Sequence, residues 1–180
     1  MADQPTLREL TALGEFDPGL AALLWLLAEH GLPLTVASVE RGAAERTRGA
    51  IVAAAGTGRA ARLAPAGGVV LADSLEGVLR LFGGDAALND ATRDLGVVVI
   101  HDGRRVRSAH YVRPVERDGA GHLQRRPPAV LADWNESADR FDDFSWAVTD
   151  ELADRSGLTR DELEREHDSR RDQLAGSGRA

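Results

Sequence analysis

The segment from Leu34 to Thr47, LTVASVERGAAERT, has the place and shape of a phosphate-binding loop: an apolar strand leads through a polar turn into a helix. A phosphate-binding loop carries Gly, four residues, Gly, Lys and then Ser or Thr. Its glycines let backbone N–H groups close around phosphate oxygens, its lysine neutralises charge, and its hydroxyl group binds Mg²⁺. The chemistry of this segment therefore depends on whether these residue types recur at this spacing.

Three registers of the pattern fit the segment, and each lacks part of the chemistry. The register that begins at Ser38 has neither a cation nor a hydroxyl group in the last two positions. The register that begins at Val39 places a glutamate where the lysine should be. The register that begins at Glu40 keeps Arg46 and Thr47, but it places glutamates at both glycine positions. A carboxylate a few ångströms from a triphosphate is repulsive by about 1 kcal/mol even with water-like screening.

The positions of this segment that would bind a nucleotide are Ser38, Gly42, Arg46 and Thr47. We interpret them as degenerate phosphate-loop positions and predict no catalytic residue and no bound cofactor. ATP with Mg²⁺ would bind only if Arg46 and Thr47 formed an atypical loop. The simplest alternative is a strand-to-helix turn without nucleotide chemistry, because short motifs of this kind are weak evidence.

Composition limits the classes of protein that the chain can belong to. It has 180 residues and no cysteine, which excludes disulfides and thiolate metal sites. Its 29 acidic residues outnumber its 22 basic ones, and the net charge of −7 argues against general attraction to nucleic acid. The longest apolar run, Leu20 to Ala28, is too short to cross a bilayer, and no basic-then-apolar leader opens the chain. We therefore expect a cytoplasmic protein.

Residues 1–95 have the pattern of alternating helices and strands. The expected elements are a helix from Asp17-Pro18 to Gly31, a strand at Leu34–Ala37, a helix at Gly42–Ala55, a loop at Gly56–Gly68, a strand at Val69–Ala72, a helix capped by Asp73 or Ser74, and a short helix at Asp85–Arg93. This order predicts a small parallel α/β layer, similar in outline to a nucleotide-binding fold.

Residues 96–180 have the pattern of a β-meander followed by helices. The expected elements are strands at Gly96–Ile100, Val106–Val115, Pro128–Trp134 and Phe141–Trp146, then helices at Val148–Arg155 and Thr159–Leu174. Asp102-Gly103 predicts a two-residue hairpin, DGAGH at 118–122 predicts the next turn, and Thr159 with Glu162 predicts a capping box. We predict an α/β fold, α+β overall, in which the four-stranded antiparallel meander forms a second region or continues the first domain.

Several other clusters of side chains are of types that could do chemistry. The histidines, for which we expect surface or capping roles and no metal site, are His30, His101, His110, His122 and His167. The arginine-rich hairpin segment carries Arg104, Arg105, Arg107, Arg113, Arg117, Arg125 and Arg126. It is either a contact face for nucleic acid or an acidic protein, or a solvated strand face, or a partner of the acidic residues in 133–172. Strand alternation would place Phe144 and Trp146 in the core beneath the last helices.

Two stretches of the chain resemble the type II/type IV secretion ATPases, especially their archaeal and pilus-assembly branch. LAALLWLLAEHGLPLTVAS, from Leu20 to Ser38, is similar to the Leu-rich helix and strand that lead into that family's phosphate loop. VVLADSLEGVLRLF, from Val69 to Phe82, is similar to its histidine-box strand and the following helix. The chain keeps the Ala-Asp-Ser of that box, but Leu71 stands where its histidine would be. The resemblance covers roughly residues 7–55 and 68–82.

The chain departs from the family pattern at the positions that carry the catalytic chemistry. In the family an acidic box and a Walker B segment lie between the two parts, whereas only the loop at 56–68 separates them here. The loop lysine, the Walker B acids and the histidine are all absent. The resemblance thus implies a shortened, degenerate relative that does not hydrolyse ATP.

The function implied is that of a partner or regulator of an active homologous ATPase, or of its membrane platform, without membrane insertion and without nucleic acid. Two alternatives remain open. One is an ATP-binding P-loop ATPase of the same family that uses an atypical loop. The other is a binding module that acts through the arginine-rich hairpin. Oligomeric state stays open in all three.

Overall fold

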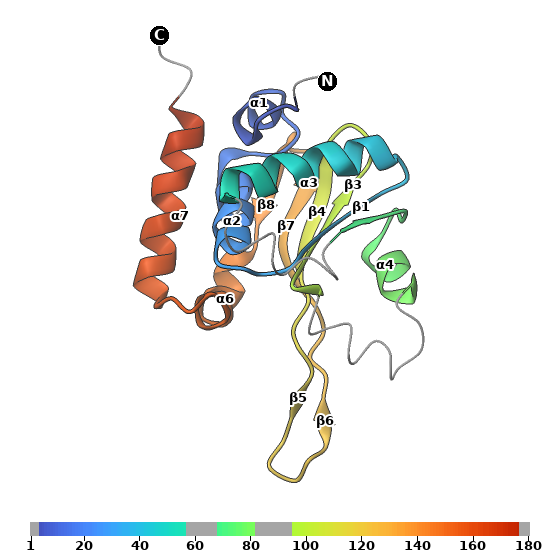
Figure 1. Cartoon of the computed structure of the whole chain (residues 1–180), viewed down its shortest axis with the longest axis vertical. Helices are drawn as coiled ribbons and strands as arrows, with labels where there is room; N and C mark the ends of the chain where they lie inside the picture. The colour runs from blue at the N-terminus through green and yellow to red at the C-terminus, as the bar shows by residue number, and fades with distance from the viewer. Residues whose placement is uncertain (1–3, 57–67, 82–94, 177–180) are drawn as a thin grey trace.

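The computed structural model describes residues 4–56, 68–81 and 95–176, and its centre is a mixed sheet of six strands (Figure 1). In spatial order the strands are β2 (Val69–Val70), β1 (Leu34–Ser38), β3 (Val97–His101), β4 (Val106–Tyr111), β7 (Ala129–Asn135) and β8 (Arg140–Asp143). β2, β1 and β3 are parallel, and β4, β7 and β8 follow as antiparallel neighbours. The α/β fold and the four antiparallel strands from β3 to β8 are therefore as predicted.

Helices cover both faces of the sheet. One core cluster joins the sheet to α1 (Leu7–Ala12), α2 (Pro18–Glu29), α3 (Arg41–Ala55), α6 (Thr149–Ser156) and α7 (Arg160–Ala175). A second, smaller cluster joins the other face of β1 and β3 to α4 (Leu75–Leu81) through Val78. Adjacent residues of one strand enter different clusters, as Val99 and Ile100 do, because side chains alternate along a strand. None of the described helices is long and apolar enough to cross a bilayer.

The helix ends follow the local signals in the sequence. The Oδ1 atom of Asp17 accepts a hydrogen bond from the backbone N–H of Leu20 at 2.7 Å, and Pro18 opens α2. The predicted capping box of α7 is confirmed: the N–H of Thr159 donates to Glu162 at 2.8 Å, and the N–H of Glu162 donates to the Thr159 hydroxyl at 3.3 Å. Of the two predicted caps of α4, Ser74 accepts from the helix, because its hydroxyl oxygen lies 3.2 Å from the N–H of Gly77.

The sheet crosses the boundary between the two regions predicted from sequence. β1 pairs with β3 over its full length, from Leu34 beside Val97 to Ser38 beside His101. Gly96 makes this approach sterically feasible: its φ is +49°, and a Cβ atom there would lie 2.5 Å from the backbone oxygen of Pro33. The same Pro33 oxygen accepts a hydrogen bond from the N–H of Val97 at 2.8 Å. The two patterns of sequence therefore share one sheet.

The hairpin between β3 and β4 forms, but not as a two-residue turn. β3 ends at His101 and β4 begins at Val106, so four residues connect the two strands. Within this connection, the N–H of Asp102 donates to the carbonyl of Arg105 at 3.0 Å. The Oδ1 atom of Asp102 accepts from the N–H groups of Arg104 at 2.8 Å and Arg105 at 2.9 Å. The side chain of Asp102 thus replaces strand pairing at these residues, as aspartates in turns commonly do. The predicted turn length was wrong for this reason.

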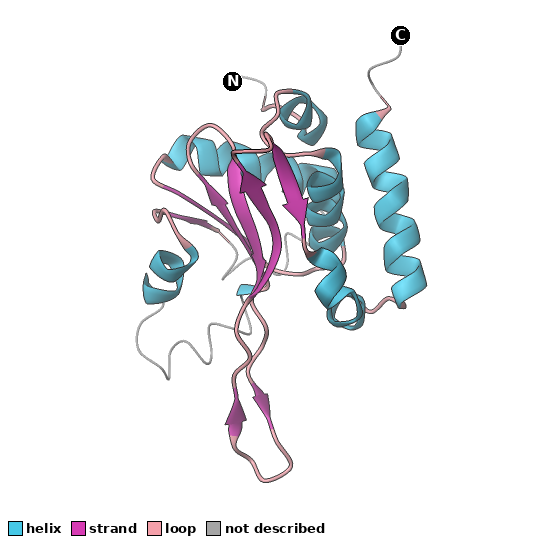
Figure 2. Ribbon diagram, turned by 180° about the vertical axis from the view of Figure 1, so that it is seen from behind, coloured by secondary structure: helices cyan, strands magenta, loops and turns pink. Residues whose placement is uncertain are grey.

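Beyond β4 the chain leaves the body as an arm, here defined as residues 113–128 (Figure 1 and Figure 2). β4 ends at Tyr111 and not at Val115, and the arm carries the short strands β5 (Glu116–Arg117) and β6 (Leu123–Gln124). The predicted turn at 118–122 is confirmed, because the Oδ1 atom of Asp118 accepts from the N–H groups of Ala120 at 2.9 Å and His122 at 2.8 Å.

The last predicted strand was too long, and the aromatic side chains at its end are not core residues. β8 ends at Asp143, whose Oδ1 atom accepts from the N–H of Ser145 at 2.8 Å, and the 3₁₀-helix η2 (Ser145–Val148) follows. Phe144 is 40% exposed and Trp146 is 70% exposed. The turn made by Asp143 ends the alternation on which the prediction depended. The helix predicted at Asp85–Arg93 lies outside the described residues, as does nearly all of the loop at 56–68.

Candidate functional site

The carboxyl ends of β1 and β3 form the candidate functional site. These parallel neighbours end side by side, with Ser38 paired to His101. The chain leaves β1 through α3, which packs on one face of the sheet, and reaches β3 after α4, which packs on the other face. Open α/β sheets bind ligands at such a point, where the crossovers diverge to opposite faces. The predicted phosphate-loop residues lie at this edge.

The connection from β1 to α3 consists of only two residues, Val39 and Glu40. The buried hydroxyl oxygen of Ser38 accepts a hydrogen bond from the N–H of Glu40 at 3.0 Å, so it is engaged within this turn. Gly42 lies in the first turn of α3 and is exposed. A phosphate cradle needs several successive backbone N–H groups arranged around an anion. A two-residue connection offers no such loop, although it does join a strand to a helix as predicted.

Arg46 and Thr47 lie in the second turn of α3, where they meet a glutamate that precedes α2. Thr47 is fully buried, and its hydroxyl group contacts the carboxylate of Glu15 and the backbone oxygen of Ala43, the latter at 3.0 Å. The nearest guanidinium nitrogen of Arg46 lies 3.9 Å from the Oε2 atom of Glu15. The structure thus brings two of the four predicted positions together around Glu15, which sequence reasoning did not single out.

His101, at the end of β3, completes this cluster. Its Nδ1 atom accepts a hydrogen bond from the N–H of Gly103 at 2.8 Å, so the ring proton belongs on Nε2, which lies 3.0 Å from the Oε1 atom of Glu15. His101 is 1% exposed, and Glu15 is 4% exposed. The expectation of a surface or capping role for this histidine was wrong. The available signal was its place directly after the apolar run of β3.

We call Glu15, Thr47 and His101 the buried triad. The triad links three elements that are distant in sequence: the loop before α2, the second turn of α3 and the end of β3. Its groups satisfy one another's hydrogen-bonding capacity away from solvent, which is the usual requirement for buried polar side chains. A Thr47 hydroxyl held in this way does not face a solvent-borne Mg²⁺ ion.

Glu40, in the β1–α3 connection, lies against the turn that follows β3. A Cβ atom at Gly103 would lie 2.6 Å from the Oε1 atom of Glu40, so the Glu40 carboxylate rests directly against the β3–β4 turn. Gly103 has a φ of +99°. A carboxylate at this position repels a polyphosphate. Within the described part of the chain, no group of three or more acidic, histidine or cysteine side chains could hold a metal ion.

The arginine-rich hairpin segment does not form one face. Arg104, Arg105 and Arg107 lie at one end of β4, whereas the other four arginines lie beyond its opposite end. The Nε atom of Arg113 lies 2.8 Å from the Oε2 atom of Glu151 on α6, and Arg126 approaches the same carboxylate at 3.4 Å. Pairing between this segment and the acidic C-terminal residues therefore occurs within one chain.

Comparison with known proteins adds no relative. No protein-family model matches the chain, and no curated protein matches it in sequence. The class of protein that the structure defines is an α/β domain with a six-stranded mixed sheet. The resemblance to secretion ATPases stays a prediction.

Proposed function

We propose that the chain is a non-catalytic relative of the type II/type IV secretion ATPases, which acts as a partner or regulator of an active homologue. The observation that carries this proposal is the two-residue connection between β1 and α3, which stands where the phosphate loop of an active enzyme would stand. Two further observations support the proposal: the order of elements in the two similar stretches, and the absence of the residue types that would act on ATP.

The side chains around the connection support the absence of hydrolysis. To bind Mg²⁺, the Thr47 hydroxyl would have to leave Glu15 and the Ala43 carbonyl and reach solvent, which breaks a fully buried set of contacts. To bind a phosphate, Arg46 would have to move away from Glu15. The Glu40 carboxylate lies beside Gly103, between the ends of β1 and β4. The positions of Thr47, Arg46 and Glu40 therefore all disfavour a bound polyphosphate, and no side chain replaces the loop lysine.

The role as a partner follows from what the chain retains. α2, β1, α3, β2 and α4 occur in the order that the resemblance requires, and they form a packed layer on the two sides of β1. A protein that has this layer but lacks the groups that hydrolyse ATP could associate with an active homologue as a non-catalytic subunit. It would then alter the assembly or the rate of that homologue.

The first test is isothermal titration of the purified chain with Mg-ATP. We expect no saturable heat at ATP concentrations up to about 1 mM, a limit that corresponds to about 4 kcal/mol of binding free energy. Micromolar binding that is lost in Arg46→Ala would overturn the proposal and favour the atypical-loop ATPase. Arg41→Ala is the matched control, since Arg41 is also on α3 but pairs with Glu45, at 3.6 Å.

The second test addresses the partner. The chain is mixed with the active secretion ATPase encoded in the same genome, and both co-elution and the rate of ATP hydrolysis are measured. We expect a mixed complex and a changed rate per active subunit. A chain that neither co-elutes nor alters the rate contradicts the regulatory role. Salt-dependent binding to nucleic acid that Arg104→Ala, Arg105→Ala and Arg107→Ala abolish would favour the arginine-hairpin module.

A further inference from the structure

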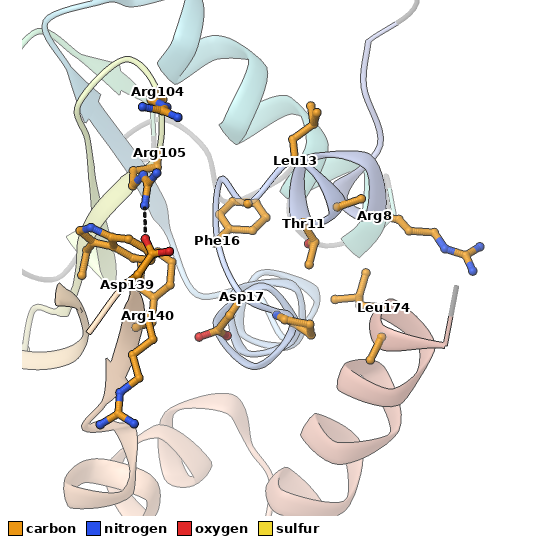
Figure 3. A pocket seen from close by; sticks show the side chains of 16 residues that line it. Arg8, Thr11, Leu13, Phe16, Asp17, Arg104, Arg105, Asp139, Arg140 and Leu174 are labelled. Atoms are coloured by element: carbon orange, nitrogen blue, oxygen red, sulfur yellow. Dashed lines mark ion pairs between the residues drawn. The ribbon is translucent and has the colours of Figure 1, made fainter. Parts of the chain in front are cut away.

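A cavity of about 690 Å³ lies beside the β3–β4 turn, at the same end of the sheet as the buried triad (Figure 3). Four parts of the chain enclose it: α1 with the loop that follows, the β3–β4 turn, the hairpin between β7 and β8, and the last turn of α7. No member of the buried triad lines it. Its volume falls in the range of small-molecule sites, about 300–1,000 Å³.

One wall of this cavity is apolar and aromatic. Phe16 lies at its centre in Figure 3 and is 1% exposed, which fixes its ring within the core. Trp134 and Phe141 form an edge-to-face pair with centroids 5.0 Å apart. Leu13, which is 78% exposed, stands at the rim. An apolar body placed here would remove Leu13 from water and would contact rigid rings, both of which favour binding.

Two neighbouring arginines on the β3–β4 turn adjoin this aromatic wall. The Arg105 guanidinium lies 4.1 Å from the centroid of the Trp134 ring and 3.9 Å from the Oδ1 atom of Asp139. Among the described residues, Arg104 has no ion-pair partner, although it is the adjacent cation. Asp102 holds the backbone of both arginines through its carboxylate. The turn therefore presents two adjacent guanidinium groups, of which that of Arg105 is already stacked on Trp134.

The remaining charges of the lining do not cancel this cation. The Asp17 carboxylate caps α2 through the N–H of Leu20, and Asp139 lies opposite Arg105. Arg8 and Arg140 extend outward, away from Phe16 (Figure 3). Asp139 is the only non-glycine residue with a positive φ, +50°, in the described part of the chain. Aspartate adopts this left-handed backbone conformation more readily than most residues, and here it serves the turn between β7 and β8. The unmatched charge facing the cavity is that of Arg104.

We infer that this cavity binds a planar aromatic anion, such as an aryl carboxylate or aryl sulfonate. The rings pack on the aromatic pair and Leu13, and the acidic group accepts charge-assisted hydrogen bonds from Arg104 and Arg105. Guanidinium groups can bind both the rings and the acidic group of such a ligand, because they stack on aromatic rings and bind planar acids through two N–H groups. This site lies outside the β1–α3 connection, and the inference does not depend on the proposed function.

The test compares two fluorescent probes that share their ring system. 8-Anilinonaphthalene-1-sulfonate is an aryl anion, and N-phenyl-1-naphthylamine is its uncharged counterpart. Each is titrated into the folded chain, with circular dichroism as the check on folding. We expect one saturable site for the anion, with a dissociation constant at least about tenfold lower than that of the neutral probe. Equal affinities, or no saturable site, would overturn the inference.

Variants separate this cavity from other surface sites. Arg104→Gln and Arg105→Gln should each weaken binding of the anilinonaphthalene sulfonate about tenfold and leave the neutral probe unchanged. Arg117→Gln, on the arm, is the matched control, since its guanidinium donates to the Gly121 carbonyl at 3.0 Å and lies outside the cavity lining. Arg105 also packs on Trp134, so Arg105→Gln could unfold the chain. In that event the binding measured for Arg104→Gln tests the inference. Equal weakening by Arg117→Gln contradicts a specific site.

Discussion

The Nε2 atom of His101 lies 3.0 Å from the Oε1 atom of Glu15, and the two residues are 86 positions apart in the chain. This hydrogen bond ties the end of β3 to the loop that precedes α2. Thr47 joins the same carboxylate from α3. At this edge of the sheet, the ends of β1 and β3 are therefore joined to α3 and to the loop before α2 by buried polar side chains. The contribution of these side chains can be measured as a change in the free energy of unfolding.

Replacing Thr47 with valine should destabilise the fold. Thr47→Val keeps the shape of the side chain but removes a hydroxyl group from the buried Glu15 carboxylate, so the free energy of unfolding should fall by about 1–3 kcal/mol. Urea unfolding followed by circular dichroism measures it. Thr11→Val is the matched control, because the half-buried Thr11 hydroxyl donates only to Leu7 of its own helix, at 2.8 Å. A Thr47→Val chain as stable as the wild type would contradict the role of the triad.

Replacing Gly96 with alanine should cost more than replacing Gly121 with alanine. Both glycines have positive φ, +49° and +86°, so each variant incurs backbone strain of about 1–2 kcal/mol. At Gly96 the new Cβ atom would also lie 2.5 Å from the Pro33 oxygen, whereas Gly121 has nothing within 4 Å. Denaturant midpoints of the two variants measure the difference. Equal midpoints would mean that β1 and β3 separate without cost at this point.

The stability of the Arg113–Glu151 pair should depend on pH. The hydrogen bond from Arg113 is the main cause that lowers the pKa of Glu151 from its ordinary value of 4.5. The stabilisation is therefore fully present above pH 4.5 and is lost as the pH falls through the lower pKa of the folded state.

Thermal unfolding of the wild type and of Glu151→Gln, followed from neutral pH to acid, measures this effect. The wild type should have the higher melting temperature at neutral pH, and the gap should close in acid. Glu45→Gln is the control, because Glu45 pairs with Arg41 on the exposed face of α3, at 3.6 Å. A gap that stays constant with pH would contradict the assignment.

His110 should make the fold less stable in mild acid. Burial lowers the pKa of His110 from its ordinary value of 6.5, while the Asp133 charge acts in the opposite direction. As the pH falls below 6.5, the unfolded chain takes up a proton that the folded ring resists, so stability falls until the pH reaches the folded pKa.

Urea unfolding at pH 7 and pH 5 tests this prediction. His110→Gln should lose less stability than the wild type between these two pH values. Ser108→Ala is the control: it removes the hydroxyl group that is hydrogen-bonded to the His110 Nε2 atom at 2.8 Å but keeps the ring, so the pH dependence should remain. An identical loss in His110→Gln and the wild type would contradict the effect.

The parts of the fold that could be predicted depend on local signals. Asp17 with Pro18, and Thr159 with Glu162, place the starts of α2 and α7, because a cap satisfies N–H groups within one turn of the helix. The strands that form the sheet centre follow from short apolar runs. The turn after β3 and the end of β8 were predicted less well, because the side chains of Asp102 and Asp143 compete with strand pairing at those positions.

The candidate site, too, was predicted only in the part that depends on local signals. Its position after β1 could be predicted, since a strand, a turn and a helix follow one another in the chain. Glu15 could not be singled out, because its neighbours in the site come from α3 and β3. The exposure of Trp146 was also missed, because alternation along a strand predicts a face only while the strand continues.

The sequence by itself determined which groups are available at the end of β1: a glutamate at the turn and no lysine. This combination repels a polyphosphate electrostatically. Only the tertiary structure decided what those groups do. It shortened the turn to two residues, buried Thr47 against Glu15 and His101, and opened a separate cavity beside Arg104. The reason is that contacts between distant segments depend on how the helices and strands pack, which local patterns do not encode.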